Sequence, residues 1–207
     1  MGDARHWNEV YETKPAETVS WYEDEPCNSL AMLDAAGIKP DAAVVDVGGG
    51  ASRLVDCLLD RGFTRVSVLD LSSAALDVAR GRLAGRAGQV EWVVQDVTCW
   101  EPAPGSIDVW HDRAVLHFLV DDQDRQAYLR ALGAGLKPGG FAILAPFALT
   151  GPEKCSGLPV RHYSPGSLQS LLGPQFSLMK SLAATHITPG GSRQDFIYCL
   201  FRRTVAA

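Results

Sequence analysis

Residues 46–52 read Asp-Val-Gly-Gly-Gly-Ala-Ser, and this stretch decides the fold. It overlaps the end of the apolar run Ala43–Val47, which predicts a strand, and it precedes residues 52–61, whose apolar side chains have helical spacing. A glycine-rich loop between a strand and a helix lets a ligand approach the backbone closely. We therefore expect a ligand-binding loop at the carboxyl end of a strand.

The alternation of strand and helix continues along the chain. Apolar runs predict further strands at 66–69, 90–94, 107–110 and 141–147, and helices at 73–83, 121–136 and 167–172. The runs 176–188 and 194–202 are joined by Pro-Gly-Gly-Ser, a short connection typical of a hairpin. The pattern predicts an α/β fold: a Rossmann-like, doubly wound and mostly parallel sheet of seven strands with an antiparallel last strand. We expect one domain, 1–207, with a helical and aromatic segment (1–40) before the core (41–207).

Composition excludes several classes of protein. The 207 residues are 46% hydrophobic and 21% charged, with a formal net charge of −5 and no cluster of Lys and Arg. Nucleic acid is therefore not expected as a partner. No apolar run is long enough to span a bilayer, and the polar start is unlike a secretory signal, so we expect a cytoplasmic protein without membrane attachment. Five scattered cysteines without a CxxC motif predict reduced thiols and no metal site. The sequence does not indicate an oligomeric state.

Two carboxylates follow the next two strands. Asp70 ends the second strand, 22 positions after Gly48, where an acid can accept hydrogen bonds from both ribose hydroxyls of an adenosine. Asp96 ends the third strand and is placed to reach an adenine amino group. The alternatives are a charge at a helix N-terminus for Asp70 and a loop cap for Asp96. Arg53 occupies the last position of a dinucleotide fingerprint, which disfavours a nicotinamide oxidoreductase.

Four segments together resemble the class I methyltransferase family, over about residues 40–200: DVGGGAS (46–52), LDLS (69–72), QDV (95–97) and LKPGG (136–140). The resemblance implies S-adenosylmethionine as cofactor and S-adenosylhomocysteine as product. It places the methionyl part on the glycine loop and the ribose at the acid after the second strand, with Asp46 orienting the loop or reaching the ligand's amino group. The cofactor-binding residues expected from it, with His111 added beside the ligand, are Asp46, Gly48, Gly49, Gly50, Asp70, Leu71, Asp96, Val97 and His111.

A narrower resemblance concerns the loop GGGAS and the opening HWNEVYETK (6–14). Both are similar to the lysine methyltransferases that act on elongation factor 1A and citrate synthase, in which an aromatic N-terminal segment folds over the cofactor. By this resemblance Trp7 and Tyr11 contact the cofactor. The alternative is that they pack within an N-terminal helix.

The fourth predicted strand delivers polar residues to the same edge of the sheet. WHDRAVLHFL (110–119) resembles the segment in which the family places acceptor-binding residues. His111 is a candidate general base, since imidazole titrates near neutrality, and Asp112 is placed to orient it or to hold a cationic acceptor. Arg113 either binds the acceptor or pairs with Asp112. A structural role for each remains the alternative.

The last third of the chain adds further candidates at this edge. His186, as a catalytic residue, and Gln194, as an acceptor ligand, flank the predicted hairpin. Arg161 and Tyr163 belong to a long Gly/Pro-rich loop of a kind that often binds ligands. Cys155 in the same loop is expected to be a packing residue.

The main functional hypothesis is methyl transfer by direct in-line displacement to an amine or thiol of a small molecule. A protein-lysine methyltransferase is the alternative, although the stretch 112–117 lacks the last acid of that group's signature. A non-catalytic S-adenosylmethionine-binding module is a remoter alternative, and it predicts a blocked acceptor cavity.

Overall fold

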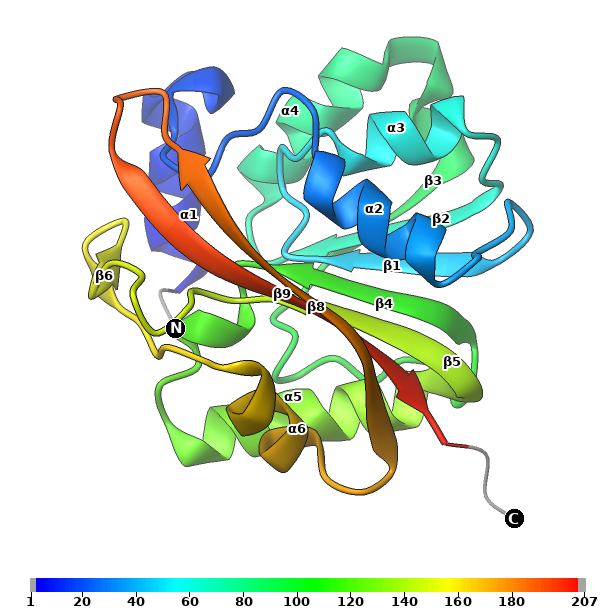
Figure 1. Cartoon of the computed structure of the whole chain (residues 1–207). Coiled ribbons are helices and arrows are strands. Elements are labelled where there is room, and N and C mark those ends of the chain that lie inside the picture. The colour runs from blue at the N-terminus through cyan, green and yellow to red at the C-terminus, as the bar shows by residue number, and fades with distance from the viewer. Residues whose placement is uncertain (1–2, 205–207) are drawn as a thin grey trace.

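A computed structural model describes residues 3–204 and contains a seven-stranded sheet in the order β3-β2-β1-β4-β5-β9-β8 (Figure 1). Strands β1 to β5 are parallel, and β9 is antiparallel to both of its neighbours, β5 and β8. The predicted doubly wound sheet with an antiparallel last strand is therefore confirmed. The strands are β1 (Ala43–Val47), β2 (Arg65–Asp70), β3 (Val90–Val94), β4 (Ile107–Arg113), β5 (Leu136–Ala145), β8 (Phe176–Ile187) and β9 (Arg193–Arg203).

Helices cover both faces of this sheet and enclose two apolar cores (Figure 1). On one face pack α2 (Cys27–Ala35), α3 (Leu54–Asp60) and α4 (Ser73–Leu83). On the other face pack α5 (Asp122–Gly135) and α6 (Pro165–Leu172). The central strand β1 has buried residues on both faces, as a parallel strand between two helical layers requires. No helix among residues 3–204 is both long and apolar enough to cross a membrane.

Strand β4 is longer than predicted. It continues through the polar residues His111, Asp112 and Arg113, where the sequence alone suggested an end at Trp110. These extra residues pair with β1 on one side and with β5 on the other. The side chains of His111 and Asp112 also form buried hydrogen bonds, which stabilise the longer strand. The Gly/Pro-rich loop also contains a small hairpin, β6 (Lys154–Cys155) with β7 (Leu158–Pro159).

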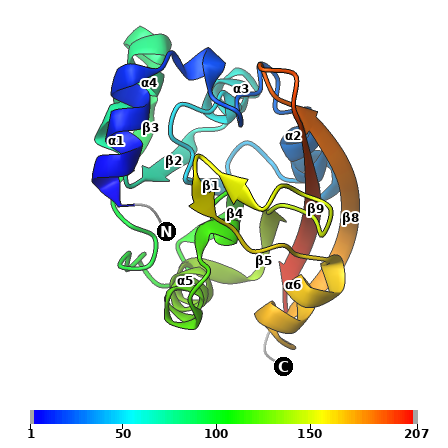
Figure 2. The same ribbon diagram turned by 90° about the vertical axis from the view of Figure 1, so that its left-hand side faces the viewer.

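The N-terminal helix α1 (Ala4–Thr13) packs beside α4 (Figure 2). The side-chain oxygen of Asn8 accepts hydrogen bonds from the Ser72 hydroxyl at 2.8 Å and the Ala74 N–H at 3.3 Å. These contacts attach α1 to the first turn of α4. Residues 14–26, which we call the strap, then connect α1 to α2.

Arg82 of α4 holds the end of the glycine loop. Its guanidinium contacts both carboxylate oxygens of Asp56 in α3, at 2.7–3.1 Å. It also donates to the carbonyls of Ala51 (2.9 Å) and Ser52 (2.7 Å). One mostly buried side chain thus ties together the loop and both flanking helices.

We expect Arg82→Leu to lower the free energy of unfolding by about 2–4 kcal/mol, because Asp56 would be left buried without its partner. Urea denaturation would measure this. Arg86→Leu is the matched control, since Arg86 pairs with Asp60 of the same helix α3 but is exposed, and it should cost less than about 1 kcal/mol. Equal losses in the two variants would contradict a special role for Arg82.

Candidate functional site

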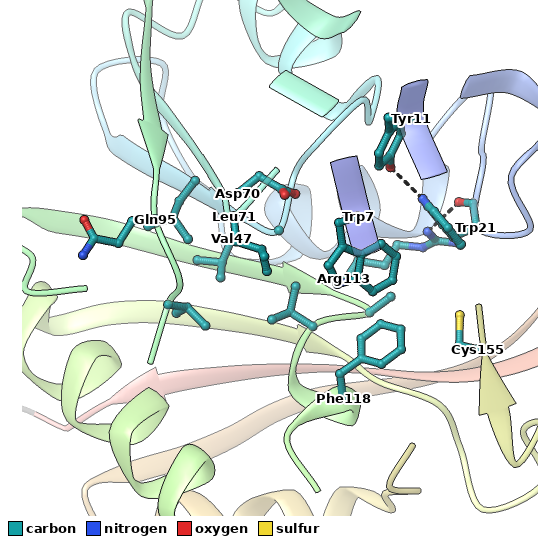
Figure 3. Close-up of a pocket in the computed structure, with 15 residues that line it drawn as sticks. Trp7, Tyr11, Trp21, Val47, Asp70, Leu71, Gln95, Arg113, Phe118 and Cys155 are labelled. Carbon is teal, nitrogen blue, oxygen red and sulfur yellow. Dashed lines mark hydrogen bonds between the residues drawn. The ribbon is translucent and has the colours of Figure 1, made fainter. Parts of the chain in front are cut away.

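A cavity of about 640 Å³, partly open to solvent, lies at the carboxyl ends of β1, β2 and β4 (Figure 3). We call it the Asp70 cavity. This is the position at which open parallel sheets bind ligands. Its lining residues are Trp7, Tyr11, Trp21, Val47, Gly48, Leu69, Asp70, Leu71, Gln95, Val97, Arg113, Ala114, Val115, Phe118 and Cys155.

The glycine loop forms one wall of the cavity, and its surroundings leave no room for larger residues. Gly48 has φ +66° and Gly50 has φ +44°, values that glycine adopts readily. A Cβ on Gly48 would lie 1.9 Å from Cγ2 of Val115, and a Cβ on Gly49 would lie 2.6 Å from Oδ2 of Asp46. Close packing on both sides therefore explains the run of glycines.

Asp70 lies at the turn from β2 into α4. Its Oδ1 accepts a hydrogen bond from the Ser72 N–H at 2.8 Å, and its Oδ2 lies beside Gly50. Burial raises the pKa of Asp70 to about 7, the negative charge of Asp46 adds to this, and the hydrogen bond from Ser72 opposes it. A ligand that donates hydrogen bonds to this carboxyl would favour its ionised form.

Aromatic side chains form the opposite part of the cavity. Trp7 makes edge-to-face contacts with Trp21 (5.6 Å between ring centroids) and Phe118 (5.2 Å). The indole N–H of Trp21 donates to the Tyr11 hydroxyl at 2.9 Å. Figure 3 shows this aromatic group on the side of the cavity away from Gln95. Trp7 and Tyr11, both expected from the sequence to contact a ligand, line the cavity together.

A second cavity, of about 540 Å³, adjoins the first beneath the strap. We call it the Asp46 cavity. The two cavities share Tyr11, Trp21, Gly48 and Arg113. The Asp46 cavity adds polar residues that the first one lacks, among them Glu23, Ser29, Asp46 and His111.

His111 joins two of these residues. Its Nδ1 lies 2.7 Å from Oδ1 of Asp46 and its Nε2 lies 2.8 Å from Oγ of Ser29. All three side chains are buried. The other carboxylate oxygen of Asp46, Oδ2, has no hydrogen-bond partner within residues 3–204. His111 is therefore placed beside the glycine loop, but both of its ring nitrogens are already engaged.

Asp112 faces the other side of the sheet. Its carboxylate accepts from the Tyr128 hydroxyl of α5 at 2.7 Å and from the N–H groups of Val115 and Leu116. Burial raises its pKa to about 6, against the lowering effect of the Tyr128 hydrogen bond. Neighbouring residues of a strand point to opposite faces. This geometry corrects the expectation that Asp112 orients His111 or pairs with Arg113.

Arg113 instead links the strap to the sheet. Its Nε donates to the Tyr198 hydroxyl at 3.0 Å and its Nη1 to the Trp21 carbonyl at 2.9 Å. Its Nη2 lies 3.2 Å from a carboxylate oxygen of Glu23, an ion pair by distance, yet makes no hydrogen bond of good geometry within residues 3–204. Arg113 lines both cavities, as a ligand-binding residue must.

Of the other expected cofactor-binding residues, some line the Asp70 cavity and one does not. Leu71 and Val97 line the Asp70 cavity, whereas Asp96 does not. The Asp96 carboxylate accepts from the Thr98 N–H and hydroxyl at 2.8 and 2.7 Å, which is the loop-cap alternative. Gln95, one position earlier, lines the cavity in its place.

The strap separates the hairpin residues from the Asp70 cavity. The His186 Nε2 contacts the carbonyl of Ser20 at 2.9 Å, and the Gln194 amide contacts the Ser20 hydroxyl at 3.3 Å. Arg161 is exposed and Tyr163 is buried near the Asp112 side of the sheet. None of these four lines either cavity. Ser20 of the strap covers His186 and Gln194, and no sequence pattern indicates that residues 14–26 lie there.

Several residues of the site were not singled out as ligand contacts by the sequence. Among them, Trp21 and Ser29 belong to no motif, and Phe118 lies within WHDRAVLHFL (110–119), in which only His111, Asp112 and Arg113 were singled out. Cys155, expected to be a packing residue, lines the Asp70 cavity, and burial raises its pKa to about 11, so that it carries a protonated thiol near neutral pH.

Comparison with known proteins agrees with this geometry. A family model described as a methyltransferase domain matches residues 44–140, which include the glycine loop, Asp70 and β4. The chain contains a class I, S-adenosylmethionine-dependent methyltransferase domain. Its fold is shared with a Burkholderia thailandensis 1,6-didemethyltoxoflavin-N1-methyltransferase whose structure holds S-adenosylhomocysteine (TM-score 0.69, 21% identity, 97% of this chain and 84% of that one).

A second structure with the same fold comes from work on the conversion of a disulfide bond into a thioacetal group during echinomycin biosynthesis. It has a TM-score of 0.78 and 19% identity, and covers 99% of this chain and 93% of that one. At these identities both likenesses establish the fold.

Two curated relatives are named as methyltransferases of the protein eEF1A. The chain is 25% identical over 220 residues to the eEF1A lysine and N-terminal methyltransferase of Bos taurus, covering 96% of this chain and 31% of the relative. It is 22% identical to the EEF1A lysine methyltransferase 2 of Danio rerio, covering 99% and 88%. The chain therefore spans about a third of the length of the first of these relatives.

We expect Asp70→Asn to stabilise the ligand-free protein above pH 7, by about 1–2 kcal/mol. The pKa of Asp70 rises from an ordinary value of 3.8 to about 7 on folding, so the native state binds more protons than the unfolded state between these values. The free energy of unfolding consequently falls as the pH rises from 3.8 to about 7, and it should fall less in Asp70→Asn.

Urea unfolding at several pH values would measure the effect. Asp77→Asn, which changes an exposed carboxylate of α4, is the control. An unchanged pH dependence in Asp70→Asn would show that Asp70 does not hold an elevated pKa.

Proposed function

We propose that the protein uses S-adenosylmethionine to methylate a nucleophilic atom of a small molecule by direct in-line displacement. The observation that carries this proposal is the junction of the two cavities. A glycine loop, the half-buried acid Asp70 at the end of β2 and an aromatic wall all meet there.

The residues fit the adenosine part of this cofactor in the Asp70 cavity. Asp70 would accept hydrogen bonds from the ribose hydroxyls, and Leu71, Gln95 and Val97 line the space beside it for the adenine. Gly48 of the glycine loop lines the same cavity, so its backbone is placed beside the ligand.

The Asp46 cavity fits the amino-acid part. Two buried atoms of opposite charge lie there: Oδ2 of Asp46, which has no hydrogen-bond partner within residues 3–204, and Nη2 of Arg113, whose neighbour is a Glu23 carboxylate oxygen at 3.2 Å without a hydrogen bond of good geometry. An amino-acid zwitterion offers an ammonium group to the first and a carboxylate to the second. Buried polar groups without partners are uncommon, so the pair supports a zwitterionic ligand.

The cofactor supplies a methyl group activated on a sulfonium, so the chain itself needs no covalent catalysis. Its task is to hold donor and acceptor in line and to exclude water. Trp7, Trp21 and Phe118 provide an apolar wall suited to the acceptor. In this proposal the N-terminal segment, within 1–40 of the single domain, acts as the lid. His111, Asp112 and His186 do not act as bases toward the acceptor, because each is bonded within the protein.

A protein amine is the second candidate acceptor. It is supported by the names of the curated relatives and by a groove beside the strap whose wall includes the acids Glu17, Glu23, Asp24 and Glu25. Such a groove suits a cationic partner. Against it, Trp21 of the strap and Cys155 of the β6–β7 hairpin both line the Asp70 cavity and limit the space beside its aromatic wall, which favours a compact acceptor.

Isothermal titration with S-adenosylhomocysteine should give micromolar binding. Asp70→Ala should weaken it by about 1–3 kcal/mol, because charged hydrogen bonds to the ribose are lost. In the unmodified protein, affinity should fall as the pH drops below about 7, since protonated Asp70 cannot accept from both hydroxyls. The exposed carboxylate variant Asp77→Ala serves as control. A folded protein that does not bind the ligand would exclude the proposed function.

Assays with a labelled methyl donor should distinguish the two acceptor classes. We expect aromatic amines or thiols to be labelled in preference to a lysine-rich protein, and Phe118→Ala to lower that rate by about tenfold through loss of the apolar wall. The double variant Asp24→Lys, Glu25→Lys should leave small-molecule labelling unchanged. Strong protein labelling that this double variant abolishes would favour the protein-amine alternative.

A further inference from the structure

Ser29, His111 and Asp46 form a continuous hydrogen-bonded chain that no motif predicted. The residues come from α2, β4 and β1, and successive atoms lie 2.8 and 2.7 Å apart. Asp46 and His111 are register partners on adjacent strands, so their side chains lie on the same face of the sheet. Ser29 approaches from the helix that covers this face.

The protons in this chain follow from its chemistry. An ionised carboxylate only accepts hydrogen bonds, so Nδ1 of His111 must carry the proton that is shared with Asp46. A neutral imidazole then has Nε2 as an acceptor, and the Ser29 hydroxyl donates to it. These hydrogen bonds thus fix the tautomer of His111. Oδ1 of Asp46 accepts from His111, while Oδ2 stays without a partner within residues 3–204.

The same three residue types activate a serine nucleophile in hydrolases. That reading does not suit this site, because the group without a hydrogen-bond partner within residues 3–204 is Oδ2 of Asp46, at the opposite end of the hydrogen-bonded chain from the Ser29 hydroxyl. Asp46 lines the cavity beneath the strap, and its Oδ2 lies beside Gly49 of the glycine loop. The function of the hydrogen-bonded chain therefore lies at Asp46.

We propose that Ser29 and His111 are positioning residues, which hold the Asp46 carboxylate so that its Oδ2 receives the ammonium group of the cofactor's amino-acid part. This inference rests on the proposed function. Ser29 of α2, a helix outside the glycine loop, then affects affinity for the amino-acid part of the cofactor through His111 and Asp46. The inference also gives His111 a role that does not require contact with the acceptor.

The test compares two ligands that differ in the amino-acid part. S-adenosylhomocysteine carries the ammonium group, whereas 5′-methylthioadenosine shares the adenosine and the thioether but lacks the amino-acid group. Titrations of the full chain with both ligands give an affinity ratio. Ser29→Ala should lower affinity for S-adenosylhomocysteine about three- to tenfold, and His111→Leu about ten- to a hundredfold, with less than twofold change for methylthioadenosine.

Two further variants keep the test decisive if His111→Leu does not fold. His111→Asn retains a donor toward Asp46 and loses the link to Ser29, so its effect should resemble that of Ser29→Ala. In an Asp46→Asn background, Ser29→Ala should have almost no further effect on affinity, because Ser29 and His111 then have no carboxylate to hold in place. Ser170→Ala, on α6 and away from both cavities, is the matched serine control.

The outcomes separate the two proposals. If the unmodified, folded protein binds neither ligand, the proposed function fails. If it binds S-adenosylhomocysteine but the variants shift both ligands equally, or neither, the positioning role is overturned while the proposed function stands. A selective loss for the ligand that carries the ammonium group supports the inference.

Discussion

The site depends on the close approach of backbone and side chains around Gly48 and Gly49. Val115, from the segment after β4, occupies the space where a side chain of residue 48 would lie, and Asp46 occupies the corresponding space at residue 49. This packing brings the ends of β1, β2 and β4 together. Arg82 then holds the far end of the loop through two of its carbonyls. The two cavities exist because the loop is kept in this position.

Three buried or partly buried acids near this edge are stabilised in different ways. Asp112 is surrounded by donors on the α5 side of the sheet and contributes to structure there. Asp46 is bonded on one oxygen only, and Asp70 receives a hydrogen bond from the start of α4 but keeps an elevated pKa. Incomplete partnering is costly in a folded protein unless a ligand completes it. The difference among the three acids therefore distinguishes the structural carboxylate from the two that face a cavity.

The N-terminal segment completes the site and couples it to the rest of the fold. Asn8 attaches α1 to α4, while the strap runs between Arg113 on one side and His186 with Gln194 on the other. The aromatic residues Trp7, Tyr11 and Trp21 are thereby placed over the ends of the strands. Residues that would otherwise face an acceptor at the hairpin are covered by this segment.

The sequence by itself determined the order of strands and helices, the antiparallel last strand, the glycine loop and the positions of Asp70, Leu71 and Val97. These features follow from local periodicity and from the rule that parallel strands end at one edge. Only the tertiary structure decided which face of β4 each polar residue takes, so that His111 meets Asp46 and Ser29 while Asp112 meets Tyr128. The same holds for the strap, which covers His186 and Gln194. These contacts join residues that are far apart in the chain, and single-residue patterns do not encode such packing.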